Sequence, residues 1–279
     1  MNAQKTWLVV NAASGSNDDE AVSALADTLG GAGCGPARIV RLPDDEQPSP
    51  ADLDREDVEL IVTFTGDGTA NAQVARLHDW SGQVLILPGG TQNLLAKRLH
   101  GDRSAEEIVA ALAGGQLVPR SLDMIRSAHG EALCEIVTGP GATWSDVRET
   151  MRDGDVAGVA QTLTEAIRQS ANGPTVAVSE PRRGKAEGYP AVRLSPANDA
   201  IKVDGYGADN VGDYARQGVA ILRRDFRTGP HDELGEHKSV TCRSDAPIEL
   251  MLDGERATGS TEERFEIAPC PVNFLGSAD

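Results

Sequence analysis

The chain has 279 residues, and its 26 basic and 43 acidic side chains give a formal net charge of −17. This acidic balance argues against a protein that binds duplex nucleic acid, because such proteins need clustered lysine and arginine to displace phosphate counterions. Aromatic residues make up only 4% of the chain, which leaves few platforms for stacking the bases of a single strand. We therefore expect no nucleic-acid partner, and the length favours two domains.

No apolar run approaches the roughly 20 residues that a membrane helix needs. The N-terminus leads directly into the apolar run Trp7–Val10 without a signal-peptide pattern. The four cysteines are far apart and form no C-x-x-C pair, which argues against a zinc site and against a disulfide framework. We expect a cytoplasmic protein with reduced cysteines and at most a peripheral contact with membranes. The sequence leaves the oligomeric state open, a homodimer included.

Short apolar runs alternate with helical patterns in the first part of the chain. The expected strands are Trp7–Val10, Ala37–Leu42, Val58–Phe64 and Val84–Leu87, and the expected helices are Asp18–Leu29, Ala70–Leu77, Gln92–Leu99 and Ala105–Leu112. Pro43–Pro50 reads as a polar loop. Alternation of this kind predicts parallel strands joined by right-handed crossovers. Residues 1–118 are therefore expected to form an α/β domain.

The pattern changes after about Leu117 to short extended runs separated by turn residues, with one helix expected at Trp144–Gln169. The expected strands are Ile136–Val137, Thr175–Ser179, Ala191–Leu194, Val219–Leu222, Ser239–Cys242, Ile248–Leu252 and Phe265–Ile267. The predicted fold is an N-terminal α/β domain with a parallel sheet, followed over residues 119–279 by an antiparallel β-sandwich domain whose chain end packs back on the first domain.

Three bends between a strand and a helix are rich in glycine, threonine, serine and asparagine. They are residues 11–15, 65–71 and 88–93, which follow the first, third and fourth expected strands. In an open parallel sheet such bends lie at the carboxyl ends of the strands, where helix N-termini direct backbone N–H groups at anions. Glycines there let phosphate oxygens approach the main chain. The three bends together favour a polyphosphate ligand.

Asp67 is the exception within these bends, because a carboxylate would repel a phosphate. A magnesium ion between the two, or a proton to be taken from an incoming hydroxyl, resolves that conflict. Each glycine motif alone is also ordinary turn chemistry. Neither a P-loop motif nor a complete G-x-G-x-x-G occurs in the sequence, so the nucleotide would be bound in another way.

These motifs resemble the diacylglycerol kinase-like catalytic fold, which joins diacylglycerol, sphingosine and bacterial lipid kinases and has NAD kinases as distant relatives. The family's GGDGT-x-N corner is similar to residues 65–71 (TGDGTAN), and its P-x-GT-x-N corner to residues 88–93 (PGGTQN). The opening N-P-x-SG element is similar to residues 11–15 (NAASG), and the L-DGE motif of the second domain to residues 252–255 (LDGE).

The resemblance implies transfer of the γ-phosphoryl group of ATP, with Mg²⁺, to a hydroxyl of a lipid-like or other small-molecule acceptor. Asp67 would position magnesium or the acceptor, Glu255 would be the general base, and Asp253 would support the turn. The residues implied to bind the nucleotide are Asn11, Ser14, Gly15, Gly66, Gly68, Thr69, Asn71, Gly89, Gly90, Thr91 and Asn93.

The sequence departs from the family pattern in several places. Thr65 replaces a glycine and Ala12 a proline, and the D-G-x-L-D element of the second domain is not found between Ile201 and Arg224. The acidic residues of that stretch, Asp204, Asp209 and Asp213, are read as a solvated loop. The sequence therefore leaves open whether the structural metal of the family's second domain is present. A nucleotide- or lipid-binding protein without transfer activity, and an NAD kinase-like enzyme, are the alternative interpretations.

Two further groups of residues are expected at the solvent-exposed surface without a functional role. The five histidines show no ligand spacing and are expected at the surface, with His231 and His237 in a polar loop. The basic turn Pro181–Lys185 is expected to be a solvated loop. With Lys97 and Arg98 it could also supply the basic patch that a peripheral lipid enzyme needs at an anionic membrane.

Overall fold

A computed structural model of the chain describes residues 4–12, 18–140, 173–207 and 231–278. It divides into two compact units, one formed by residues 1–122 together with 269–279 and the other by residues 123–268. Within the described ranges, no helix is both long enough and apolar enough to cross a membrane. The expected helix Trp144–Gln169, the strand Val219–Leu222 and the candidate ligands Ser14 and Gly15 lie outside these ranges.

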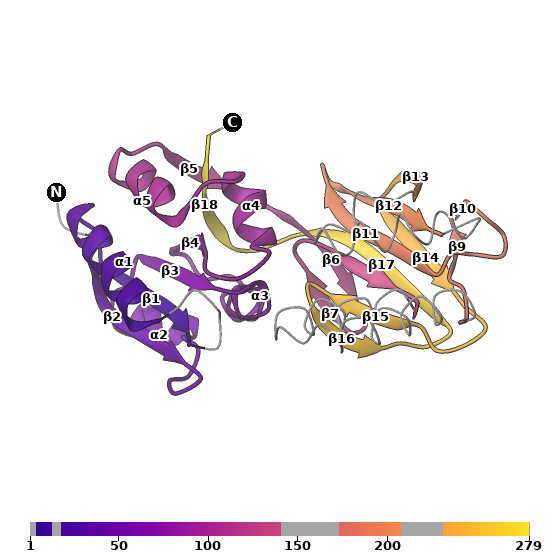
Figure 1. Cartoon of the computed structure of the whole chain (residues 1–279), viewed down its shortest axis with the longest axis horizontal. Coiled ribbons are helices and arrows are strands. Elements are labelled where there is room, and N and C mark those ends of the chain that lie inside the picture. Colours follow the sequence, from indigo (N-terminus) through magenta and orange to yellow (C-terminus); the bar gives the residue numbers. More distant parts are fainter. Residues whose placement is uncertain (1–3, 13–17, 141–172, 208–230, 279) are drawn as a thin grey trace, which may run out of the picture. The chain divides into compact units, whose positions relative to one another are not determined.

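The first unit is built on one six-stranded sheet in the order β2-β1-β3-β4-β18-β5. Strands β1, β2, β3, β4 and β18 are parallel to their neighbours, whereas β5 is antiparallel to β18. The strands are β1 (Thr6–Asn11), β2 (Pro36–Leu42), β3 (Leu60–Thr65), β4 (Gln83–Pro88), β5 (Leu117–Arg120) and β18 (Asn273–Ser277). The end of the chain therefore completes the sheet of the first unit (Figure 1).

Five helices belong to this unit, each in the described part of the chain. They are α1 (Asp19–Gly31), α2 (Pro50–Arg55), α3 (Asp67–Arg76), α4 (Leu94–His100) and α5 (Ala105–Ala113). Every residue of β3 is buried, as expected of a central parallel strand with covered faces. Val22, Leu25 and Leu29 of α1 are buried with their helical spacing and join the same core cluster as the strands.

The second unit contains two antiparallel sheets. One has the order β10-β9-β14-β17-β6-β7 and the other β13-β12-β11-β8-β15-β16. The first comprises β6 (Asp123–Ser127), β7 (Gly130–Ala132), β9 (Ala177–Glu180), β10 (Arg182–Arg183), β14 (Ser239–Arg243) and β17 (Glu262–Pro269). The second comprises β8 (Ile136–Thr138), β11 (Ala191–Ala197), β12 (Ala200–Tyr206), β13 (His231–His237), β15 (Glu249–Leu252) and β16 (Glu255–Thr258). One core cluster collects apolar side chains from both sheets, for example Val192 and Phe265.

The predicted fold class, α/β followed by antiparallel sheets, is confirmed. Some local predictions are wrong. Asp204 lies in β12 and is 1% exposed, so it is not in a solvated loop. His231 and His237 are in the edge strand β13, and His100 is buried at the end of α4. All four cysteines are free, as expected.

Candidate functional site

The carboxyl ends of β1, β3 and β4, where the three bends begin, lie at one edge of the first unit's sheet, because these strands are parallel and paired in register. A hydrogen bond joins two of them. The side-chain amide of Asn11, at the end of β1, donates from Nδ2 to Oγ1 of Thr69 in the first turn of α3, over 2.8 Å. Gln47 donates to the carbonyl of Thr69 over 3.3 Å. Thr69 is thus held from two sides at the expected nucleotide edge.

The bends after β3 and β4 pack against each other through their glycines. A Cβ atom on Gly89 would lie 2.6 Å from the backbone nitrogen of Thr65, and one on Gly90 would lie 2.6 Å from Cα of Gly66. We expected these glycines to admit phosphate oxygens. The structure gives a second and independent requirement for them, because any side chain at either position would collide with main-chain atoms of the neighbouring bend.

Asn93 closes the bend after β4 with its own side chain. It adopts the left-handed conformation (φ 56°), its Oδ1 accepts from the Gly90 amide at 2.7 Å, and its Nδ2 donates to the Gly90 carbonyl at 2.9 Å. Asparagine tolerates this conformation better than most residues. The amide of Asn93 is therefore engaged in shaping the bend. Thr91 in the same bend is exposed.

Asp67 is the first residue of α3, and its carboxylate reaches the beginning of the next helix. Its Oδ1 accepts a hydrogen bond from the backbone nitrogen of Leu95, in the first turn of α4, over 3.2 Å. Helix N-termini favour negative charge because their amides and the helix dipole point at it. This position explains how a carboxylate is accommodated in a bend that is otherwise suited to phosphate.

The N-cap residue of α3 is Gly66, which has no side chain with which to cap the helix, and Gly68 and Thr69 follow in the first turn. One turn further along, both polar atoms of the Asn71 side chain, Nδ2 and Oδ1, are buried without a hydrogen-bond partner among those residues. Buried amides in folded proteins almost always have partners. A helix N-terminus with a glycine N-cap, close to a buried amide without a partner, fits a ligand that carries phosphate and hydroxyl or carbonyl groups.

In the second unit, the motif at residues 252–255 forms the tight turn between β15 and β16. Leu252 pairs with Glu255 across the hairpin, and both Asp253 and Gly254 have positive φ angles, 47° and 100°. An Asp-Gly pair is typical of such two-residue turns. Glu255, the expected base, is exposed at the start of β16. Asp67 and Glu255 belong to different units.

Asp253 holds the loop that precedes β8. Its Oδ1 accepts from the amides of Cys134 (2.9 Å) and Glu135 (2.7 Å), and its Oδ2 accepts from the amide of Leu133 (2.5 Å). The Asp253 amide donates back to the Glu135 carbonyl over 3.0 Å. Burial, with a smaller contribution from the nearby Glu135 carboxylate, raises the pKa of Asp253 to about 7 although the three amides oppose this. The side chain that we expected to support the turn thus also fixes a neighbouring loop.

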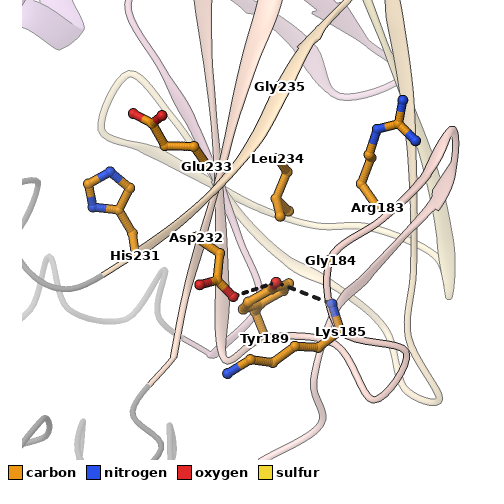
Figure 2. A pocket seen from close by; sticks show the side chains of 9 residues that line it. All are labelled: Arg183, Gly184, Lys185, Tyr189, His231, Asp232, Glu233, Leu234 and Gly235. Carbon is orange, nitrogen blue, oxygen red and sulfur yellow. Dashed lines mark hydrogen bonds between the residues drawn. The ribbon is translucent and has the colours of Figure 1, made fainter.

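A cavity of about 810 Å³ lies beside the basic turn of the second unit (Figure 2). Tyr189 forms part of its floor, with its hydroxyl donating to Asp232 over 2.8 Å and accepting from the Lys185 amide over 3.2 Å. The Arg183 and Lys185 side chains extend in different directions in Figure 2. Because these cations do not converge, the cavity does not have the arrangement of a phosphate site.

A Mg²⁺ ion at the expected nucleotide edge would need oxygen ligands from carboxylates, phosphates or water. No group of three or more His, Cys, Asp or Glu residues suited to a metal occurs in the part of the chain that the structure describes. Magnesium is usually bound by one or two carboxylates together with substrate phosphates rather than by a protein cage. Asp67, at the edge that fits a polyphosphate, is compatible with that mode of binding.

Comparisons with known proteins agree with this arrangement. Residues 5–126 match the family model of the diacylglycerol kinase catalytic domain. No protein of curated function matches the sequence. The fold is similar to a diacylglycerol kinase from Bacillus anthracis str. Sterne, with a TM-score of 0.64 and 16% identity over 99% of this chain and 98% of that one. A candidate diacylglycerol kinase from the same organism gives 0.66 and 16% over 98% and 95%. At this identity the likeness establishes the fold.

Proposed function

We propose that this chain, whose residues 5–126 belong to the diacylglycerol kinase catalytic domain family, is a kinase that transfers the γ-phosphoryl group of ATP to a hydroxyl of a lipid-like acceptor. The observation that carries the proposal is the edge of the first unit's sheet. There the N-terminus of α3, with the glycine N-cap Gly66, lies close to the amide of Asn71, which has no partner in the described ranges, and the carboxyl ends of β1, β3 and β4 share one edge.

In this proposal the first unit binds the nucleotide. The backbone amides of Gly68 and Thr69 would bind phosphate oxygens, and the Asn71 amide would bond a polar group of the nucleotide. Asp67 would help to hold Mg²⁺, which neutralises charge on the transferring phosphoryl group when it is bound. The hydrogen bond from the Leu95 amide orients this carboxylate before any ligand arrives.

The second unit would supply the base. The acceptor hydroxyl oxygen forms a bond to the γ-phosphorus as the bond to the β,γ-bridging oxygen breaks, ADP leaves, and the Glu255 carboxylate takes the hydroxyl proton. Because phosphoryl transfer depends mainly on alignment and charge neutralisation, the role proposed for Glu255 is to align the acceptor hydroxyl and take its proton. The turn held by Asp253 sets where Glu255 begins its strand.

The test is a transfer assay with the full chain, γ-labelled ATP and Mg²⁺, offering 1,2-dioctanoylglycerol, sphingosine and NAD in separate reactions. The proposal predicts label in a lipid acceptor. Label only in NAD would favour an NAD kinase-like enzyme, and nucleotide binding without any transfer would favour a binding protein. Either result would contradict the proposal.

Variants then test the two assigned roles. Asp67→Asn and Glu255→Gln are each expected to lower turnover by about 10²- to 10⁴-fold while ATP still binds, because they remove charge or proton acceptance from the reaction itself. Asp102→Asn and Glu249→Gln are matched controls that change exposed carboxylates in the same units and should leave turnover unchanged. Equal turnover in all four variants would remove both roles.

A further inference from the structure

The turn that carries Glu255 is tied to a loop of the same unit. Residues 133–135 connect β7 to β8, and their three backbone amides donate to the carboxylate of Asp253. The loop ends where Ile136 pairs with Leu252, the residue before Asp253. A displacement of this loop would therefore also displace the turn.

One side chain of this loop, the carboxylate of Glu135, is itself a buried charge. It is only 6% exposed. The amide of Glu135 donates to Asp253 over 2.7 Å, and its carbonyl accepts from the Asp253 amide over 3.0 Å. Burial, and to a smaller extent the charge of Glu135, raises the pKa of Asp253. A buried carboxylate is costly unless a cation lies beside it, so this junction requires a counter-charge.

Arg193 of β11 supplies a counter-charge. Its Nε lies 3.9 Å from Oε2 of Glu135, and its side chain is 16% exposed. At this separation the contact is an ion pair rather than a hydrogen bond, and ion pairs away from water are only weakly screened. Nε of Arg193 has no hydrogen-bond partner within the described ranges, so no hydrogen bond there draws it away from Glu135.

The neighbouring strand β12 fixes the other end of the Arg193 guanidinium group. Nη1 donates to the Tyr206 hydroxyl over 3.3 Å, and Nη2 lies 3.6 Å from Oδ2 of Asp204. Asp204 also lies 3.7 Å from the ammonium group of Lys202. The four charged side chains thus form a row of alternating sign across β12 and β11 that ends at Glu135. If Arg193 were replaced, Asp204 would keep Lys202, whereas Glu135 would lose the cation that this row provides.

We propose that Arg193 is a positioning residue for the turn that carries Glu255, and that it acts by neutralising Glu135. With its charge neutralised, the Glu135 carboxylate stays buried and the amides of residues 133–135 stay bonded to Asp253. Without the guanidinium group, the carboxylate is left uncompensated and turns toward water, which withdraws those amides. The inference rests on the proposed role of Glu255 as the base, and it adds a residue that lies outside the four sequence motifs.

The first experiment measures kcat and the KM for ATP of the full chain, with 1,2-dioctanoylglycerol or sphingosine as acceptor, whichever the wild type phosphorylates. Arg193→Met is expected to lower kcat at least about tenfold and to leave the KM for ATP within about twofold, because the first unit binds the nucleotide in the proposed function. Arg264→Met is the matched control, because it removes a cation from an exposed ion pair on β17 of the same unit, and it should leave both constants unchanged.

Rescue by a second substitution shows through which carboxylate Arg193 acts. Arg193→Met/Glu135→Gln removes both charges of the pair, which is often neutral for stability, and should recover kcat to within about threefold of wild type. Arg193→Met/Asp204→Asn should stay as slow as Arg193→Met. Arg193→Lys keeps the positive charge and should stay within about threefold of wild type even if Arg193→Met does not fold.

Four results of these assays would each overturn the inference. They are an unchanged kcat in Arg193→Met, no recovery with Glu135→Gln, an equal recovery with Asp204→Asn, and a tenfold loss in Arg193→Lys.

A second measurement needs no turnover and separates this inference from the proposed function. Amide hydrogen exchange at residues 133–135 should be at least about tenfold faster in Arg193→Met than in wild type and should return to the wild-type rate in Arg193→Met/Glu135→Gln. A wild type that transfers no phosphate would overturn the proposed function, and exchange would still decide whether Arg193 holds the turn. Equal exchange in Arg193→Met and wild type would overturn the inference whether or not the chain is a kinase.

Discussion

Replacing Asp253 with asparagine removes a carboxyl group that titrates inside the second unit. Burial raises its pKa to about 7, from an ordinary value near 3.8. At a pH between these two pKa values, the folded chain keeps a proton on Asp253 that the unfolded chain has released. The free energy of unfolding contributed by this group therefore falls as pH rises through that window.

The size of this effect follows from the pKa difference. Each pKa unit corresponds to about 1.4 kcal/mol, so ionising Asp253 across the whole window lowers stability by about 4 kcal/mol relative to a side chain that does not titrate. The other carboxyl groups are common to wild type and variant, so their contributions cancel when the two proteins are compared at the same pH. The asparagine that replaces Asp253 in the variant does not titrate, so it adds no pH dependence of its own.

Urea unfolding followed by circular dichroism, at several pH values between 4 and 8, measures the comparison. The stability of wild type minus that of Asp253→Asn should fall by up to about 4 kcal/mol across this range. Glu255→Gln, the exposed neighbour in the same hairpin, serves as the control and should follow wild type. A difference that stays constant within about 1 kcal/mol would show that burial does not raise the pKa of Asp253.

Three further predictions concern the first unit. Gly90→Ala places a Cβ 2.6 Å from Cα of Gly66 and should lower the free energy of unfolding by about 1–3 kcal/mol. Gly30→Ala is the control, because a Cβ there meets nothing within 4 Å and should leave stability unchanged. Thermal melts compare the two variants. Asn71→Ala should leave the melting temperature nearly unchanged, because its amide has no partner in the described ranges, but should weaken ATP binding about 5- to 30-fold by calorimetry. Ser49→Ala removes the capping box of α2 and should cost about 1 kcal/mol in urea unfolding.

The α/β half of the fold was largely predictable from the sequence, because buried parallel strands such as β3 are continuous apolar runs and the helices show a clear apolar period. Helix α2 was missed, although Ser49, Pro50 and Asp52 carry its start signal, because six residues are too few to display a period. Strand β13 was read as a loop, since only Leu234 of its seven residues is buried at this sheet edge.

The site was predictable in part. The bends could be located because glycine, threonine and asparagine follow apolar strands at fixed offsets. The bond between Asp67 and the Leu95 amide could not, because it joins two helices through tertiary packing. The same holds for the buried ion pairs of Arg193 with Glu135 and Asp204, which depend on the register of β8, β11 and β12.

We expect the bends after β3 and β4 to bind a nucleoside triphosphate, and hydrogen exchange reports on the backbone amides of both bends. Amide exchange of the full chain would be followed with and without a non-hydrolysable ATP analogue and Mg²⁺. Slower exchange is expected at residues 66–71 and 89–95, with smaller changes in α5 of the same unit. Unchanged exchange in both bends at saturating nucleotide, or protection confined to the second unit, would rule out nucleotide binding by these bends.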